Sequence, residues 1–329
     1  MLELRAPTLR TVLAWLVVAP WAAWGLVRIF GLEQGFPLVP LMAYTPYVLV
    51  ISALGAGVVA LLRRWAPTAV GAAATVILVI AVLPRLIPDG DPEIEHPVRL
   101  RVMTVNSHKS EADPDALARL VRENRIDLLS VQELTTEGAA RLRRSAVARR
   151  LPHGLLALQG DAYGSGIFSR YPLRKAAPVA TIREIDATVR LPGARVEVSC
   201  VHPVAPTASG SVGLWRNTLD ALPRAEPGGP LRILAGDFNA TLDHDALRDL
   251  IASGYRDAAD AEGAGLDFTW PVGRPFPPLI AIDHVLADER IGVSDFEVHD
   301  VPGSDHRAIT VALSLPRAGS GSRPRRPKG

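Results

Sequence analysis

Several apolar segments of this 329-residue chain end in a carboxylate, an amide or an imidazole. In residues 231–239 an apolar run leads into Asp237 and Asn239, which are two positions apart and therefore share one face of an extended chain. A carboxylate and an amide on one face can address two atoms of the same substrate. Polar residues stand at the ends of other apolar runs in the same manner: Asn106, Glu133, His202, Asp283, Asp305 and His306.

Any one of these residues alone is more typical of a helix cap or a solvated strand end than of a catalyst. Together, at one rim of a folded domain, they would supply four carboxylates, two amides and two imidazoles. Clustered carboxylates repel one another, and a hard cation usually compensates that repulsion. Oxygen donors without cysteines or a His-x-x-x-His spacing favour Mg2+, with Mn2+ as the alternative, over zinc.

The segments that would position these residues alternate between strand and helix patterns from residue 98 onward. Strands are predicted over residues 98–106, 126–134, 166–173, 180–191, 194–202, 231–239, 278–287, 292–300 and 306–315. Helices are predicted over residues 113–124, 135–150, 211–224 and 243–254. Many strands with few helices predict two packed sheets with helices on their outer faces, and the single cysteine, Cys200, falls within a buried strand.

The motifs TVN, VQE, VH, GDFN, IDHV and SDH follow one another in this order between about Arg99 and Ile309. In this pattern the chain resembles the endonuclease/exonuclease/phosphatase superfamily, which includes pancreatic-type deoxyribonucleases, abasic-site endonucleases, neutral sphingomyelinases and inositol-polyphosphate phosphatases. The most specific part is GDFN followed about 65 residues later by SDH. The resemblance implies an α/β fold, a four-layered sandwich of two packed mixed sheets flanked by helices, and a Mg2+-dependent phosphoric ester hydrolase.

The resemblance also implies which residues hold the metal and which act on water and phosphate. Glu133 binds the metal with Asn106 close to it, and Asp305 is a further group that belongs to the metal site or positions the phosphate. Asp237 orients or deprotonates the attacking water, and Asn239 holds a phosphate oxygen. Such an assortment suits phosphodiester hydrolysis, in which positioning and charge neutralisation supply most of the catalysis.

The histidines carry the remaining roles that the resemblance implies. His306 contacts the scissile phosphate, Asp283 fixes the tautomer of His306, and His202 is a candidate general acid for the leaving oxygen. Tyr163 either reaches a phosphate or is a partly buried ring at the start of a glycine-rich strand. His108 stands where abasic-site endonucleases have an acidic residue, which is a departure from the metal arrangement of that subgroup.

The first 84 residues contain three runs that are almost free of charge, at about residues 11–30, 41–62 and 66–83. Each run has roughly the 17–25 residues that a bilayer-spanning helix needs. We therefore predict three transmembrane helices. The alternatives are a signal peptide for the first run and buried helices of a soluble domain for all three.

The arginines predict the orientation of these helices, because short loops rich in Lys and Arg stay on the cytoplasmic side. Arg5 and Arg10 precede the first run, and Arg63 and Arg64 lie between the second and the third. The N-terminus is therefore predicted to be cytoplasmic and the C-terminal domain extracytoplasmic, in a multi-pass protein of the cell membrane. The predicted division is a transmembrane region (1–84), a linker (85–97), a catalytic domain (98–315) and a disordered basic tail (316–329).

The distribution of charge argues against a domain that coats nucleic acid with a basic surface. The formal net charge of the chain is +2. Residues 98–315 nevertheless contain more acidic than basic residues, whereas residues 316–329 contain basic residues and no acidic one. The tail is predicted either to touch an anionic polymer or lipid, or to act only as a solubilising end.

Two classes of function remain open from the sequence. The first is a membrane-anchored phosphodiesterase. We expect an endonuclease-like enzyme that acts on nucleic acid, which His202 and the basic tail favour; the alternative is a lipid phosphodiesterase or phosphatase, which the membrane helices and the acidic domain favour. The second is a non-catalytic outer domain that binds a partner through a degenerate site. Because no residue of the expected set is missing, the sequence favours the enzyme. It does not indicate an oligomeric state.

Overall fold

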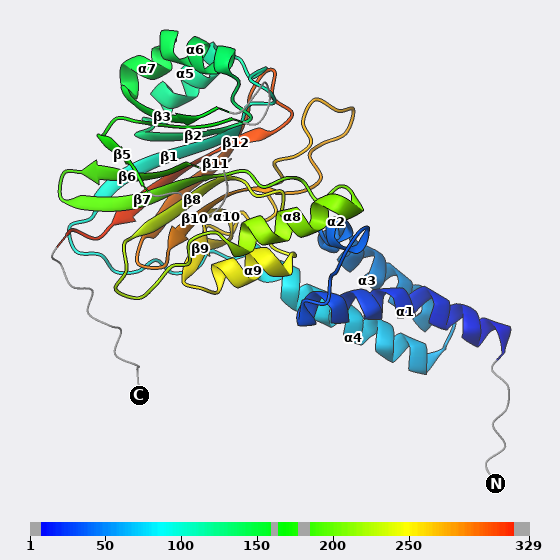
Figure 1. Cartoon of the computed structure of the whole chain (residues 1–329). Coiled ribbons are helices and arrows are strands. Elements are labelled where there is room, and N and C mark those ends of the chain that lie inside the picture. Colours follow the sequence, from blue (N-terminus) through cyan, green and yellow to red (C-terminus); the bar gives the residue numbers. More distant parts are fainter. Residues whose placement is uncertain (1–7, 159–163, 177–184, 319–329) are drawn as a thin grey trace.

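Two six-stranded sheets lie face to face within the residues that the structure, a computed structural model, describes: 8–158, 164–176 and 185–318 (Figure 1). The first sheet has the order β11 (Gly292–Asp300), β12 (Arg307–Leu315), β1 (Val98–Asn106), β2 (Leu128–Gln132), β4 (Ser165–Ser169) and β3 (His153–Ala157). The second has the order β5 (Leu173–Lys175), β6 (Ile185–Leu191), β7 (Ala194–Val201), β8 (Arg232–Asp237), β10 (Asp283–Asp288) and β9 (Tyr255–Asp257). Both sheets are mixed, with β1 parallel to β2 and β7 parallel to β8.

The space between the sheets is filled by alternate residues of the strands. Val102 of β1 and Leu128 of β2 meet Val198 of β7 and Ile233 of β8 in one buried cluster. Successive side chains on a strand point to opposite faces, so Met103, the neighbour of Val102, lies in a different cluster on the outer face. Each sheet therefore has a second apolar face that needs a cover.

Helices provide that cover on both outer faces (Figure 1). The outer face of the first sheet carries α5 (Pro114–Glu123), α6 (Thr136–Arg144) and α7 (Ala146–Arg150). The outer face of the second carries α8 (Ser209–Asp220) and α9 (Asp245–Ile251), and the single-turn helix α10 (Ala258–Ala261) lies next to β9 and β10. The predicted four-layered α/β sandwich is therefore confirmed, and Cys200 is buried on β7 as predicted.

Local details differ from the sequence prediction. The predicted helix over residues 135–150 is two helices, because Ser145 takes an extended conformation and its side chain caps α7 by accepting from Val147 N. The predicted strand over residues 166–173 is also two, β4 and β5, which belong to different sheets. Of the predicted strand over residues 180–191, residues 180–184 lie outside the described ranges.

The N-terminal part forms a helical bundle that projects from the sandwich (Figure 1). Its elements are α1 (Leu9–Phe30), α2 (Leu38–Met42), α3 (Thr45–Leu61), α4 (Trp65–Val82) and a terminal 3-10 turn, η1 (Leu83–Leu86). Within the described residues two helices, α1 and α4 extended by η1, are long and apolar enough to cross a membrane, by length and composition only.

The prediction of three spans needs correction at its second run. Residues 41–62 do not form one helix, because the chain turns after α2 and begins again with Pro46 in the first turn of α3. The 17 residues of α3 give a length of about 26 Å, whereas the hydrocarbon core of a bilayer is about 30 Å thick. α3 is therefore shorter than the two candidate spans and lies at the lower limit of length for a membrane-spanning helix.

Candidate active site

The ends of the central strands bring most of the predicted site residues to one edge of the sandwich. The parallel strands β1 and β2 end at Asn106 and just before Glu133. In the second sheet β8 ends at Asp237, and the antiparallel strand β10 begins at Asp283, directly opposite Asp237. Cross-strand partners point to the same face, so both aspartates face the same space.

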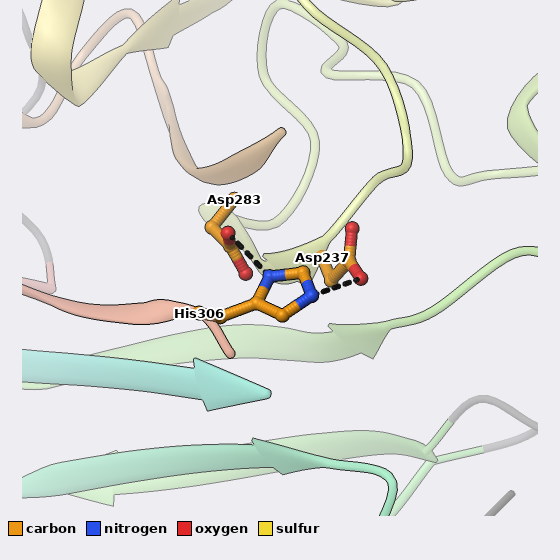
Figure 2. A group of neighbouring side chains, drawn as sticks. All are labelled: Asp237, Asp283 and His306. Carbon is orange, nitrogen blue, oxygen red and sulfur yellow. Dashed lines mark hydrogen bonds and ion pairs between the residues drawn. The ribbon is translucent and has the colours of Figure 1, made fainter. Parts of the chain in front are cut away.

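His306 lies between these two aspartates (Figure 2). Its Nδ1 is 2.9 Å from Asp283 Oδ2, and its Nε2 is 3.8 Å from Asp237 Oδ2. Burial alone would lower the pKa of His306, but the charges of Asp283 and Asp237 together outweigh it and raise the pKa to about 10. The imidazole is therefore protonated near neutral pH, and Asp283 fixes the orientation of its ring.

Asp237 is a buried carboxylate with only 2% of its surface exposed. Its Oδ1 accepts from Asn239 N at 2.8 Å, and its Oδ2 accepts from Asn106 Nδ2 at 3.0 Å. Burial raises the pKa of Asp237, and the positive charge of His306 offsets part of that rise. A carboxylate with a raised pKa has the greater proton affinity that a general base near neutral pH requires.

Asn106 connects Asp237 to the other sheet. Its Nδ2 also donates to Glu133 Oε1 at 3.1 Å, whereas its Oδ1 accepts from His108 N at 3.0 Å. Glu133 Oε2 accepts from the backbone N of Lys109, and Glu133 itself has a φ of 53°, which is rare for this residue type. In this arrangement the amide nitrogen of Asn106 holds the carboxylates of Glu133 and Asp237 close together.

His202, which follows β7, faces the same two carboxylates. Its Nε2 is 3.8 Å from Glu133 Oε1 and 3.8 Å from Asp237 Oδ2. Its Nδ1 is buried and has no hydrogen-bond partner among the described residues. Asn239 lies beside them, and its backbone is in the left-handed conformation with a φ of 48°. Its Nδ2 donates to Pro203 O.

Asp305 lies near the same ring nitrogen of His306 as Asp237 does. Its Oδ1 is 2.8 Å from His108 Nδ1 and 3.9 Å from His306 Nε2. Its Oδ2 accepts from Trp270 Nε1 at 3.3 Å. His108, the departure from the abasic-site pattern, is thus a partner of Asp305.

The structure brings together all the predicted site residues except Tyr163, which lies outside the described residues. Sequence reasoning missed Ser304, whose Oγ donates to Asn106 O at 2.7 Å and accepts from His306 N at 3.0 Å. It also missed the buried pair of His284 and Asp257, in which His284 Nε2 contacts Ala240 O, close to Asn239. Ser304 and His284 lie within the quoted motifs, at the Ser of SDH and the His of IDHV, and this position was the available signal; Asp257 lies in none of the motifs.

The geometry identifies a group that could hold a metal ion. Asp237, Asp283 and His306 each offer a ligand atom, and these atoms lie within 4.8 Å of one another. This group differs from the predicted metal set of Glu133, Asn106 and Asp305. Two of its members, however, are already hydrogen-bonded to each other, with His306 Nδ1 at 2.9 Å from Asp283 Oδ2. The neighbouring carboxylates, Asp237 and Glu133, are not paired in this way, and both accept from Asn106 Nδ2.

Comparison with known proteins gives one sequence match. A sequence profile described as "Endonuclease/Exonuclease/phosphatase family" matches residues 103–306. No curated protein matches the chain.

Solved structures give further matches in fold. An endonuclease/exonuclease/phosphatase from Beutenbergia cavernae DSM 12333 has 22% identity and a TM-score of 0.52, covering 66% of this chain and 72% of its own. A TDP2 of D. rerio, humanized by 14 mutations, has 16% identity and a TM-score of 0.50, with coverages of 65% and 98%. An AP endonuclease from Archaeoglobus fulgidus has 14% identity and a TM-score of 0.51, with coverages of 64% and 98%. At such identities the likeness shows a shared fold.

Proposed function

The chain belongs to the endonuclease/exonuclease/phosphatase family, and from this membership and the geometry of its site we propose that it is a Mg2+-dependent phosphodiesterase held on a membrane. The observation that carries the proposal is the arrangement around His306. Its Nδ1 is hydrogen-bonded to Asp283, and its Nε2 faces the buried carboxylate of Asp237. A site that only bound a partner would not need a carboxylate base facing a protonated imidazole.

The donor set fits a hard divalent cation. Among the described residues, the polar partners of Glu133 and Asp237 include histidines, Asn106 and backbone amides but no Lys or Arg side chain. Asp283 Oδ1 is buried and has no partner in the same ranges. Glu133 would hold Mg2+, or Mn2+ as the alternative, with Asn106, Asp237 and Asp305 around it. The bound ion would neutralise charge on the phosphate.

The residues of the chain divide the remaining work. Asp237 takes a proton from the attacking water, and Asn239 beside it holds a phosphate oxygen. His306, positively charged and oriented by Asp283, donates to a non-bridging oxygen of the phosphate. His202, whose Nε2 faces the same space, supplies a proton to the leaving oxygen.

The substrate that we propose is a phosphodiester of nucleic acid. Two of the proteins that are similar in fold are named as a TDP2 and an AP endonuclease, and the second name denotes an enzyme of nucleic acid. A phospholipid headgroup is the second candidate, because the apolar bundle contacts loops that adjoin the site, as at Tyr47 Oη, which donates to Leu279 O at 2.8 Å.

We also propose that the bundle anchors the domain in the membrane. Much of its apolar surface is uncovered by protein: Leu16 is 66% exposed and Ile80 is 68% exposed. The C-terminal ends of α1 and α4 both lie at the sandwich (Figure 1), so the chain must return between them, and α3 is the segment that does so. Arg10, Arg63 and Arg64 at the opposite end of the bundle support the proposal of a cytoplasmic N-terminus and of an extracytoplasmic catalytic domain, residues 98–315.

Hydrolysis of bis(p-nitrophenyl) phosphate by the full chain in lipid nanodiscs tests the activity. We expect release that depends on Mg2+ and falls by about 10²–10⁴-fold in Asp237→Ala and His306→Ala. Asp300→Ala, which removes an exposed carboxylate on β11, is the matched control and should keep the wild-type rate. Equal rates in all four proteins would disprove the proposal. Plasmid DNA and phospholipid vesicles, offered in parallel, distinguish the two substrates.

A further inference from the structure

The helical bundle is joined to the sandwich by a buried cluster of charges. Arg28, in the last turn of α1, is 2.7 Å from Asp243 Oδ1 through its Nε. Arg85 of η1 contacts the same carboxylate with two nitrogens, Nη2 at 2.6 Å from Oδ1 and Nη1 at 2.9 Å from Oδ2. The side chains of Arg28, Arg85 and Asp243 are 9%, 6% and 1% exposed. A bidentate hydrogen bond between an arginine and a carboxylate, such as that of Arg85 with Asp243, is among the strong hydrogen bonds of proteins.

The segment of chain that receives these arginines follows directly after the site. Asp243 is six residues beyond Asp237. Arg28 Nη2 also donates to Leu242 O at 3.0 Å, so both the side chain and the backbone of this segment are held. Further along, Asp245 N donates to Glu33 Oε1.

Contacts within the segment continue from Asp243 back to the site. The backbone N of Thr241 donates to His244 Nδ1 at 2.8 Å, and His244 Nε2 is 3.0 Å from Val39 O of the bundle. Ala240 O is held by His284 at 2.9 Å. The residues between Asp237 and Asp243 therefore form a short turn whose conformation is restrained by hydrogen bonds.

The bundle also contacts the loop that precedes Asp283. Tyr47 donates to Leu279 O, and Ala43 lies in one buried cluster with Ile280 and Ile282. Ile282 O in turn accepts from Phe238 N at 2.9 Å, between the two catalytic aspartates. The segment that follows Asp237 and the loop that precedes Asp283 are thus both held by contacts with the helical bundle.

Buried ion pairs add little net stability, because desolvating the charges costs about as much as their attraction returns. Their better-attested effect is to fix one arrangement. We propose that Arg28 and Arg85 are positioning residues for catalysis: by fixing Asp243 they hold the turn of Asp237 and Asn239 against His306. The bundle is then a structural part of the active site as well as its anchor. This inference rests on the proposed phosphodiesterase activity.

The test uses the full chain in lipid nanodiscs with bis(p-nitrophenyl) phosphate and Mg2+. We expect Arg28→Met and Asp243→Asn to lower kcat by roughly 10²-fold with KM nearly unchanged, because the reacting groups are displaced while the substrate still binds. Arg28→Lys keeps the charge and should restore most of kcat. Arg10→Met, at the exposed opposite end of α1, is the matched control and should equal the wild type.

Hydrogen exchange gives a second readout that does not need activity. In Arg28→Met, amides of residues 237–245 should exchange several-fold faster, whereas those of α5 on the far face should not change. An unchanged kcat in folded Arg28→Met and Asp243→Asn would overturn the inference, as would an Arg28→Lys variant as slow as Arg28→Met. Faster exchange throughout the sandwich would also overturn it, because that pattern means a purely structural role.

The outcomes also separate this inference from the proposed function. If the wild type is no faster than Asp237→Ala, the phosphodiesterase proposal fails and the role in catalysis fails with it, while the exchange data still decide whether the bundle fixes the turn. If the wild type is active and Arg28→Met and Asp243→Asn have the same activity, only the positioning role fails.

Discussion

Asp237 and Asp283 lie directly opposite each other on the antiparallel strands β8 and β10, and the ring of His306 bonds to one and faces the other. Because strand pairing sets the separation of the two carboxylates, the site depends on the register of one pair of strands. A slip of either strand by one residue would turn its own aspartate to the opposite face, away from the other. The following predictions depend on these contacts.

Asp283→Asn should shift the pH dependence of the reaction. The charge of Asp283 is a main cause of the raised pKa of His306, so its removal lowers that pKa from about 10. The alkaline limb of the pH–rate profile should therefore move to lower pH, with kcat reduced by about 10²–10⁴-fold. Rates measured across the pH range at constant Mg2+ check this. An unmoved alkaline limb would show that His306 does not titrate in it.

Ser304→Ala should weaken the fold and the site together. The hydroxyl of Ser304 bridges Asn106 O and His306 N, and its loss leaves two buried backbone groups without that partner. We expect a loss of about 1–3 kcal/mol in the free energy of unfolding, measured by denaturant titration. Ser314→Ala, which removes the hydroxyl of a half-buried residue that accepts an exposed hydrogen bond from Arg99, should change it by less than about 0.5 kcal/mol. Equal effects of the two variants would contradict the prediction.

His244 should make the folded chain less stable in acid. Burial lowers its pKa from 6.5 to about 4, so the folded ring stays neutral where the unfolded chain binds a proton. The contribution of the neutral His244 ring to the free energy of unfolding is fully present above pH 6.5. It is lost as the pH falls towards 4, by at most about 3 kcal/mol.

The matched variant for this prediction is His244→Gln, which keeps a donor for Val39 O but does not titrate. Its unfolding free energy should depend less steeply on pH between 6.5 and 4 than that of the wild type. Parallel pH profiles of the two proteins would show that His244 does not supply the effect.

Mg2+ should stabilise the folded chain through Glu133. A ligand that binds only the folded state at 100 times its dissociation constant adds about 2.7 kcal/mol. Thermal unfolding with Mg2+ should therefore occur at a higher temperature than with a chelator. Glu133→Gln removes the charge without changing the shape of the side chain, and it should abolish most of the difference. A Mg2+ effect that persists in this variant would place the ion elsewhere.

Much of the candidate site could be predicted because its information is local. The residue after an apolar run lies at the end of a strand, and the order of the motifs from Asn106 to His306 gave the residues that the fold brings together. The roles given to these residues stay predictions, and Tyr163 stays untested.

The contacts of the bundle could not be predicted in the same way. Arg28 and Asp243 are 215 positions apart, and nothing in the residues around either one indicates the other. Likewise β3 has no strict alternation of apolar and polar residues, and its pairing with β4 depends on a neighbour supplied by the fold.

The path of residues 85–97 has a final consequence. This stretch, predicted as a linker, is bound to the sandwich at several points: Arg85 at Asp243, Asp89 N at Ala261 O, and Asp91 at Arg256. If the bundle lies in a bilayer, the sandwich cannot swivel above it as a tethered domain would. The site then keeps a constant height and tilt relative to the lipid, and every substrate must approach it in that one fixed orientation.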